Sequence, residues 1–409
     1  MEKNYSKEEN IAWIKKIVVW ITLLFMPFST YATPINGITY GDFLLIIGIV
    51  FVAVYIGNSK INLNKVITWQ LIFYIFLILL NSCIFWIVKF NGLSEGLLSV
   101  TRYILYIFWV SITAKEFFDF KYAYKVYKIL ALAFAIYCMM QFVAFHLFNK
   151  VLPINVLGLP KVSYIADKYS EETIEYYING TTIFRPYSVF VEPAYFAVYE
   201  IPILYLILND VIKKEKNIIK YGISIIITVA LIMTSSTTGY ILLVICWFKP
   251  ILSLLRKSPK TILIVLILTI ILGLYLFNSS YFKRISTRII NTDGTLGKSI
   301  TGRFGNMHIL YDGTMNFMQI VFGQGMWTET EYLPSYGRII VSFGIIGLIA
   351  IILMFFYDYI KANKIGKIMI LLLMVMCFGT NTFFNISSVL ILTIIYSNMK
   401  KELSENYNN

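Results

Sequence analysis

Charged residues are scarce in this sequence. Only 14% of its 409 residues are Asp, Glu, Lys or Arg, whereas 58% are hydrophobic. The mean hydropathy is +0.73. A soluble domain cannot keep so much apolar surface out of water. The composition therefore excludes a soluble enzyme and indicates an all-α, polytopic transmembrane protein.

Histidine and cysteine are also rare, with two and four residues. The cysteines lie in apolar runs without the C-x-x-C spacing of metal or redox sites, so we expect neither a disulfide framework nor a metal site and interpret them as small buried apolar residues: Cys83, Cys138, Cys246 and Cys377. Glu8 and Glu9 precede the first apolar run, which lacks a small-residue cleavage site, so this run is expected to remain as a helix.

Long apolar runs dominate what is present. A helix needs about 20 apolar residues to cross a bilayer. The sequence predicts about twelve such spans in one integral membrane domain over 1–409, with the last two short. They are 17–33, 41–57, 66–88, 96–114, 126–148, 190–208, 218–234, 238–255, 261–277, 337–356, 367–380 and 386–399.

The distribution of lysine gives an expected orientation. The net charge of +13 would suggest nucleic acid in a soluble protein, but lysines that collect in cytoplasmic loops explain it, so no nucleic-acid partner is expected. With both termini cytoplasmic, most basic residues lie inside. Two large external loops then remain, 149–189 and 278–336, and long external loops are where binding and chemistry are usually placed.

The arginines are distributed differently from the lysines. Only Arg256 is expected inside, and Arg102 lies within the fourth span. The others are expected at the outer surface: Arg185, Arg284, Arg288, Arg303 and Arg338. Because a guanidinium binds phosphate or carboxylate through two parallel bonds, these residues predict a phosphate site there. The alternative is solvation, or pairing with lipid headgroups and loop carboxylates, and for Arg284 and Arg288 the two readings are balanced.

Charges within spans are costly and indicate function by default. Arg102, Glu192 and Glu200 qualify, and Arg102 is at a depth that allows pairing with Glu192, either in function or simply to fix helix register. Pro193 follows Glu192 and places it at or just before a helix start. Free amide groups there favour a carboxylate that acts as a general base or stabilises a cation.

Two further segments carry polar groups. The uncharged stretch Thr234 to Gly239 is sufficient for a helix turn, and it can equally form a donor surface for an anion or sugar. Residues 303–322 predict an amphipathic helix lying on the membrane surface. On that helix His308 and Asp312 have i,i+4 spacing, so His308 is a possible base, the alternative being an ordinary interfacial histidine.

Several of these stretches together resemble the bacterial O-antigen and capsule repeat-unit polymerases of the Wzy type. Residues 185–197 (RPYSVFVEPAYFA) are similar to that family's R-P-x-G-x-F-x-E-P signature, with Ser188 where Gly is common. Residues 234–240, Thr301-Gly302-Arg303, 322–325 (FGQG) and 335–348 match further family pieces in order. The resemblance covers about residues 180–350. The first five spans match only in hydropathy.

The resemblance implies a glycosyltransferase with a GT-C-like helical architecture. Its expected substrate is an undecaprenyl-pyrophosphate-linked oligosaccharide, polymerised at the outer face of the bacterial plasma (inner) membrane. No cofactor and no metal are expected, and a chain-length regulator is the partner that the family implies. The glycan could belong to O-antigen, capsule or exopolysaccharide. The expected substrate-binding residues are Arg102, Arg185, Tyr187, Ser235, Arg288, Arg303, Tyr336 and Arg338.

Four residues are expected to be catalytic, namely Arg185, Glu192, Arg303 and Arg338. The arginines would stabilise charge on the departing pyrophosphate. Glu192 would activate the acceptor hydroxyl or position Arg185, and these roles stay open. Related O-antigen ligases carry a histidine in an H-N-x-Y arrangement where this chain has Leu333-Pro334-Ser335-Tyr336. This favours a polymerase over a ligase. Two alternatives stay open: a ligase-type lipid-linked glycan transferase of the same superfamily, and, as the more distant one, a lipid-linked oligosaccharide flippase.

Overall fold

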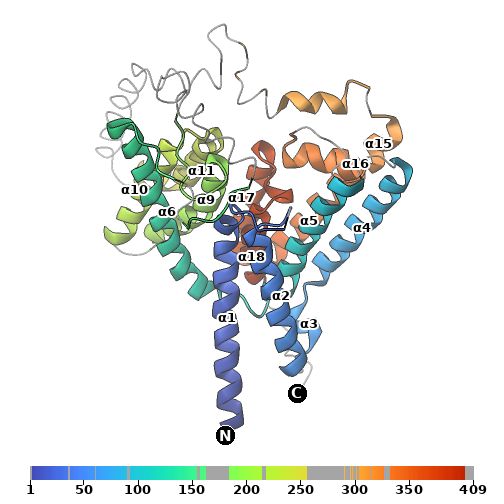
Figure 1. The fold of residues 1–409 in the computed structure, drawn as a ribbon, viewed down its shortest axis with the longest axis horizontal. Helices are drawn as coiled ribbons and strands as arrows, with labels where there is room; N and C mark the ends of the chain where they lie inside the picture. Colours follow the sequence, from blue (N-terminus) through green and yellow to red (C-terminus); the bar gives the residue numbers. More distant parts are fainter. Residues whose placement is uncertain are drawn as a thin grey trace. The chain divides into compact units, whose positions relative to one another are not determined.

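The structure is a computed structural model. It describes residues 2–35, 37–59, 61–89, 93–153, 157–162, 184–213, 218–255, 304–313, 315–326 and 332–400, together with Ile290, Thr295, Gly297 and Thr301. Within these residues all regular structure is helical, apart from isolated bridges such as Tyr31 with Lys161. Figure 1 shows the helices.

The predicted apolar runs are found as helices. They are α1 (Glu2–Phe28), α2 (Tyr40–Ser59), α4 (Trp69–Lys89), α5 (Leu93–Thr113), α6 (Phe120–Phe148), α9 (Pro193–Lys213), α10 (Ile218–Met233), α11 (Thr237–Leu255), α16 (Ser335–Lys361), α17 (Lys364–Gly379) and α18 (Ser387–Ser397). The predicted span 261–277 lies outside the described residues. The short elements are α3 (Leu63–Val66), η2 (Gly305–Leu310), α15 (Phe317–Phe322) and η3 (Thr382–Phe384).

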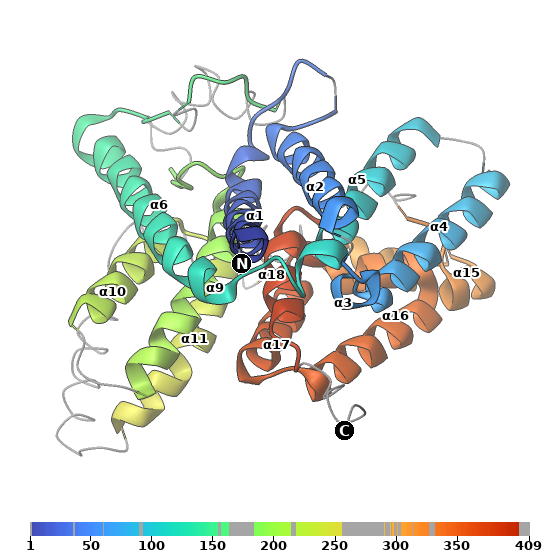
Figure 2. The same cartoon turned by 90° about the horizontal axis from the view of Figure 1, so that it is seen from below.

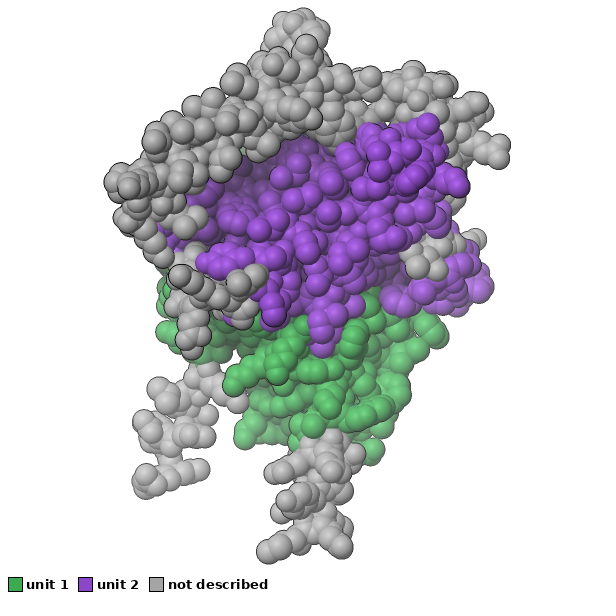
Figure 3. All heavy atoms as spheres, turned by 90° about the vertical axis from the view of Figure 1, so that its left-hand side faces the viewer, with its two compact units in different colours: residues 1–26, 41–125, 309–409 green, residues 27–40, 126–308 purple. Residues whose placement is uncertain are grey.

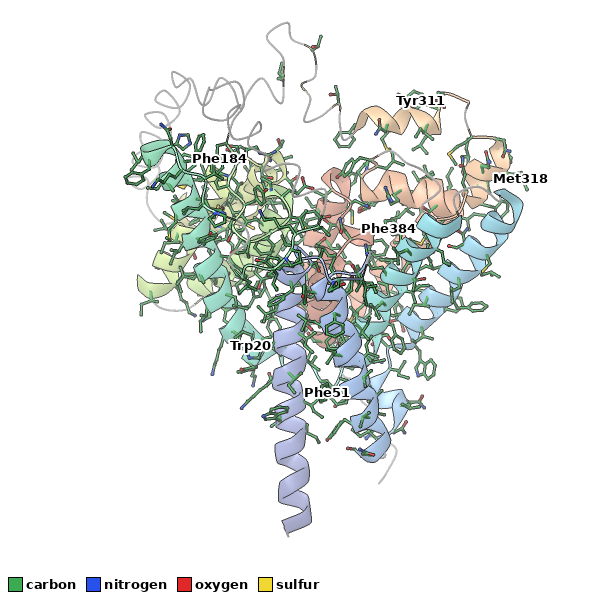
Figure 4. All side chains as sticks on the ribbon, in the orientation of Figure 1. Trp20, Phe51, Phe184, Tyr311, Met318 and Phe384 are labelled. Atoms are coloured by element: carbon green, nitrogen blue, oxygen red, sulfur yellow. The ribbon has the colours of Figure 1, made fainter. Side chains whose placement is uncertain are left out.

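Five stretches of the described helices are long and apolar enough to cross a membrane. They are Ile11–Phe28, Tyr40–Ser59, Gly96–Thr113, Phe120–Phe148 and Ser335–Lys361. Large apolar side chains are exposed on these helices, as contact with lipid requires. Phe51 on α2, for example, is 55% exposed (Figure 4). The chain is therefore a helical membrane protein. The total of about twelve spans and the orientation stay predictions.

The predicted surface helix over 303–322 is wrong as a single helix. The structure has the 3₁₀ helix η2 and the short helix α15, separated by a turn in which Gly313 has φ of 84°. Asn316 then begins α15 with a capping box: its side chain accepts from the Gln319 amide, and the Gln319 side chain accepts from the Asn316 amide. Turn and cap signals thus override the amphipathic pattern.

Contacts divide the chain into two compact units, coloured separately in Figure 3. Unit 1 contains residues 1–26, 41–125 and 309–409, and unit 2 contains residues 27–40 and 126–308. Each unit is described by itself below.

Unit 1 is held by close packing around α5. A Cβ on Gly48 of α2 would lie 2.5 Å from the ring of Trp109 and 2.9 Å from Ile21 of α1, so α1, α2 and α5 approach closely at this glycine. The Trp109 indole also donates to Thr22. On α5, Tyr103 packs against Phe383 and Phe384, which precede α18 (Figure 4 labels Phe384).

The carboxyl-terminal end of unit 1 is fastened to the turn between α16 and α17. The side-chain amide of Asn363 donates to the side-chain carbonyl of Asn398 over 2.9 Å. The backbone amide of Lys400 donates to the Lys361 carbonyl over 3.0 Å. Lys364 and Lys367 lie on the following turn of α17. These lysines thus gather beside the end of α18, as a common side of the membrane would require.

Unit 2 is organised around α9, which contacts α6, α10 and α11 (Figure 2). Its residues are buried on every face from Phe196 to Ile201. The Tyr127 hydroxyl of α6 donates to the Tyr199 carbonyl, and the Cys246 thiol of α11 lies 3.9 Å from the Ile201 carbonyl. The helix that begins at the predicted motif is therefore the core of its unit.

Candidate functional site

The segment from Arg185 to Ala197 turns directly into α9. This helix begins at Pro193, so the prediction that Glu192 lies just before a helix start is confirmed. The Glu192 carbonyl accepts from the amides of Tyr195 and Phe196, at 3.0 and 3.2 Å. Glu192 is thus the residue just before the first turn of α9, and it is half-buried.

The backbone before this helix is unusual at Ser188, where φ is 58°. Few residues with a side chain adopt this left-handed region, and glycine adopts it without steric cost. Ser188 is also the position at which the resembled family often carries glycine. The family preference thus has a physical counterpart in this chain.

The side-chain amide of Gln141 on α6 binds both backbone groups of Ser188. Its amide donates to the Ser188 carbonyl over 3.0 Å, and its carbonyl accepts from the Ser188 amide over 2.8 Å. Both residues are buried. The sequence analysis missed Gln141, for which the available signal is a polar side chain inside a long apolar run.

The turn from Thr234 to Gly239 meets the first segment. The Arg185 guanidinium donates through Nε to the Thr234 carbonyl over 3.4 Å. A Cβ on Gly239 would lie 3.4 Å from the Cβ of Ala197 and 3.3 Å from the Cβ of Ser236. Two of the motifs selected from the sequence, 49 residues apart at this contact, therefore lie against each other in unit 2.

Several hydroxyl groups of this turn stabilise the turn itself. Thr234 donates to the Leu231 carbonyl, and the Ser236 hydroxyl accepts from the Gly239 amide. Ser235 is buried and has a φ of 50°. The helix-turn interpretation thus accounts for Thr234 and Ser236, and a donor surface for substrate stays a prediction.

A second group of predicted residues lies at the start of α16 in unit 1. Arg338 is only 8% exposed. Tyr336 donates to the Met374 carbonyl over 3.2 Å and packs against Phe378 with 4.3 Å between ring centroids, so its observed contacts join α16 to α17. Ser335 donates to the Thr380 carbonyl and accepts from the Phe383 amide. The first turn of α16 is therefore rigidly held.

The later glycine motifs of the resemblance also meet within unit 1. α16 is interrupted at Gly344, whose φ and ψ are 70° and −174°. The Val341 carbonyl just before this break accepts from the Gln324 amide at 2.7 Å, and the Ser342 carbonyl accepts from the Gly325 amide at 3.0 Å. Backbone groups that a broken helix would leave unpaired in a membrane are thereby satisfied.

Arg102 forms an ion pair that the sequence analysis did not anticipate. Its Nε lies 3.2 Å from a carboxylate oxygen of Asp42 on α2, and the Tyr106 hydroxyl donates to the other oxygen over 2.9 Å. Glu192, the predicted partner, belongs to unit 2. The missed signal was Asp42 itself, an acidic residue within the apolar run 41–57.

Glu200, within α9, differs from Glu192, which lies just before this helix. Glu200 is fully buried, and within the described part of the chain neither of its carboxylate oxygens has a hydrogen-bond partner. Burial without a partner disfavours a charged carboxylate. The two glutamates on this segment thus occupy opposite environments.

His308 is exposed on η2, with its Nδ1 2.7 Å from the Gly305 carbonyl. Because η2 ends at Leu310, Asp312 lies in the following turn, and the two residues do not share the predicted helix. His308 as a possible base therefore stays a prediction, without one continuous helix to support it. Arg288 and Arg303, like Arg284, lie outside the described residues.

The structure thus brings Arg185 against the Thr234 to Gly239 turn in unit 2, with Tyr187 and Glu192 on the same segment as Arg185, and holds Tyr336 and Arg338 on α16 in unit 1. Tyr187 is buried within the motif. Comparison with known protein families, curated proteins and solved structures finds no significant match to this chain.

Proposed function

We propose that the protein is a glycosyltransferase that polymerises undecaprenyl-pyrophosphate-linked oligosaccharide repeat units at the outer face of the bacterial plasma membrane. The observation that carries the proposal is the contact between Arg185 and the Thr234 carbonyl, which joins two motif segments that resemble this polymerase family. The left-handed backbone at Ser188, where the family often has glycine, supports the same assignment.

In the proposed reaction a growing glycan leaves one lipid pyrophosphate and is transferred to a hydroxyl of the next lipid-linked repeat unit. Negative charge develops on the departing pyrophosphate, so guanidinium groups are suitable electrostatic catalysts. Arg185, Arg303 and Arg338 have this role in the proposal, with Arg102 and Arg288 as further substrate contacts. The lipid tail would remain in the bilayer.

Glu192 has one of two roles in this reaction. Its position just before the start of α9 suits a general base for the acceptor hydroxyl. The same carboxylate could instead orient Arg185, seven residues earlier on the segment. His308, exposed on η2, is the second candidate for the base.

Deletion of the gene tests the proposal and separates it from its alternatives. Surface glycan that is reduced to single repeat units supports a polymerase. Complete absence of surface glycan indicates a flippase, and long polymer that is not attached to its acceptor indicates a ligase. Unchanged glycan in the deletion strain rules out all three functions.

Arg185 provides the residue-level test. Arg185→Ala should abolish polymer at normal protein level, and Arg185→Lys should restore little, because lysine cannot form the planar two-bond contact. Arg256→Ala is the matched control, since Arg256 is the arginine expected on the cytoplasmic side. Chain-length ladders like those of the wild type in Arg185→Ala would refute the pyrophosphate role.

A further inference from the structure

The turn before α9 adopts a backbone conformation that its own side chain does not favour. Ser188 has φ of 58°, and its buried hydroxyl has no hydrogen-bond partner among the residues that the structure describes. The serine side chain therefore contributes steric strain and no compensating bond. Something outside Ser188 must hold the turn in this shape.

Gln141 supplies both bonds that the Ser188 backbone needs. A single primary amide donates to the carbonyl and accepts from the amide of the same residue, and both residues are at most 2% exposed. Without Gln141, one buried N–H and one buried C=O would have no partner there, which is costly away from water. The amide orientation follows from the contacts, because only one orientation satisfies both.

The neighbouring positions are fastened less specifically. The Thr30 hydroxyl donates to the Val189 carbonyl over 2.9 Å, and Phe190 packs between Phe134 of α6 and Tyr199 of α9. These contacts locate the segment on unit 2. Among the described residues, the Gln141 amide is the group that binds both backbone groups of Ser188.

We propose that Gln141 is a positioning residue that sets the geometry between Arg185 and Glu192. Ser188 lies between them, three residues after Arg185 and four before Glu192. A change in the φ angle of Ser188 would therefore change the position of the Arg185 side chain relative to that of Glu192. This inference rests on the proposed function for its catalytic consequence, but the existence of the Gln141 clamp on Ser188 can be measured without any assay of glycan.

Hydrogen exchange of the full-length protein in detergent tests the clamp. Gln141→Leu keeps a side chain of similar size but removes both hydrogen bonds to the Ser188 backbone. Hydrogen exchange in the peptide that contains the Ser188 amide should therefore accelerate by about tenfold or more. Tyr137→Phe is the matched control on the same helix, because it removes a bond to the Pro153 carbonyl and leaves Ser188 untouched. Equal exchange in wild type and Gln141→Leu would overturn the proposal.

Glycan length in the deletion strain tests the positioning role. Gln141→Leu should shorten the polymer at normal protein level, and the added change Ser188→Gly should restore much of it, since glycine adopts the positive φ without a clamp. If Gln141→Leu acted only by destabilising the whole protein, glycine at position 188 would not restore polymer length. Faster exchange with full-length polymer in Gln141→Leu would refute positioning.

A variant at Ser188 covers the case in which Gln141→Leu fails to fold. Ser188→Val keeps the Gln141 amide but places a β-branched side chain at the positive φ, which should shorten the polymer, whereas Ser188→Gly alone should not. Equal polymer length in these two variants would overturn the proposal. If deletion of the gene leaves the glycan unchanged, the proposed function fails while the exchange experiment still decides the clamp.

Discussion

In the segments that carry the resemblance, unit 1 has positive φ at Gly323, Gly325 and Gly344, whereas unit 2 has positive φ at Ser188 and Ser235. In unit 1 the glycines allow close backbone approach: a Cβ on Gly344 would lie 2.1 Å from the Val321 carbonyl oxygen. In unit 2 the serine backbone is instead held by a polar partner, as at Ser188. One geometry depends on the absence of side-chain atoms, and the other depends on bonds supplied from a distant helix.

This difference predicts how the glycine positions of unit 1 and the serine turns of unit 2 respond to substitution. The glycine crossing in unit 1 should be intolerant of any side chain, because the obstacle is backbone and cannot rotate away. The serine turns in unit 2 already accommodate a side chain and should accept glycine readily. Substitutions at matched positions can therefore break or sharpen the comparison.

The largest effect is expected for Gly344→Ala. Its φ of 70° and ψ of −174° lie in a region that is essentially restricted to glycine, and the new Cβ would overlap the Val321 carbonyl. We expect a loss of stability of about 3 kcal/mol or more, measured as folded yield and Tm in detergent. Gly222→Ala, which has open space around the Cβ, is the control. Equal Tm values for the two variants would contradict the comparison.

A smaller loss is expected for Gly239→Ala, at the contact between the turn and α9. The new Cβ would lie 3.3 to 3.4 Å from Cβ atoms of Ser236 and Ala197, which is tight but not overlapping. We expect a cost of about 1 kcal/mol from overpacking, measured as a shift of Tm. A loss as large as that of Gly344→Ala would show that unit 2 is as intolerant as unit 1.

The smallest effect, and one of opposite sign, is expected for Ser235→Gly. Glycine removes the strain of φ at 50°, and it increases the freedom of the unfolded chain, so the net change should lie within about 1 kcal/mol and favour the folded state. Thermal unfolding in detergent measures it. A marked drop in Tm would mean that the Ser235 side chain, rather than the backbone geometry, stabilises the turn.

The helices were predictable because apolar length alone carries the signal. Pro193 fixed the start of α9, since proline is tolerated in the first turn and disfavoured beyond it. The partners across space were not predictable. Nothing near Gln141 in the sequence points to Ser188, 47 residues later, because a side-chain bond to backbone leaves no local pattern. Asp42 could have been found, since it is an acidic residue within an apolar run.

The surface helix over 303–322 shows the opposite failure. Its amphipathic pattern predicted one helix. Instead, the turn at Gly313 interrupts the helical structure, and Asn316 caps a new helix. A hydrophobic period indicates which face is apolar and does not guarantee continuity. The arginines of this loop that matter most to the proposed reaction, Arg288 and Arg303, stay predictions.

The order of the two units along the chain has a consequence for biosynthesis. Unit 2 ends at residue 308, whereas unit 1 needs both the first and the last parts of the chain. Since synthesis runs from the amino terminus, α5 exists long before Phe383 and Phe384, the residues that cover its Tyr103. During translation this aromatic face has to be covered by lipid or by the insertion machinery until the final helices emerge.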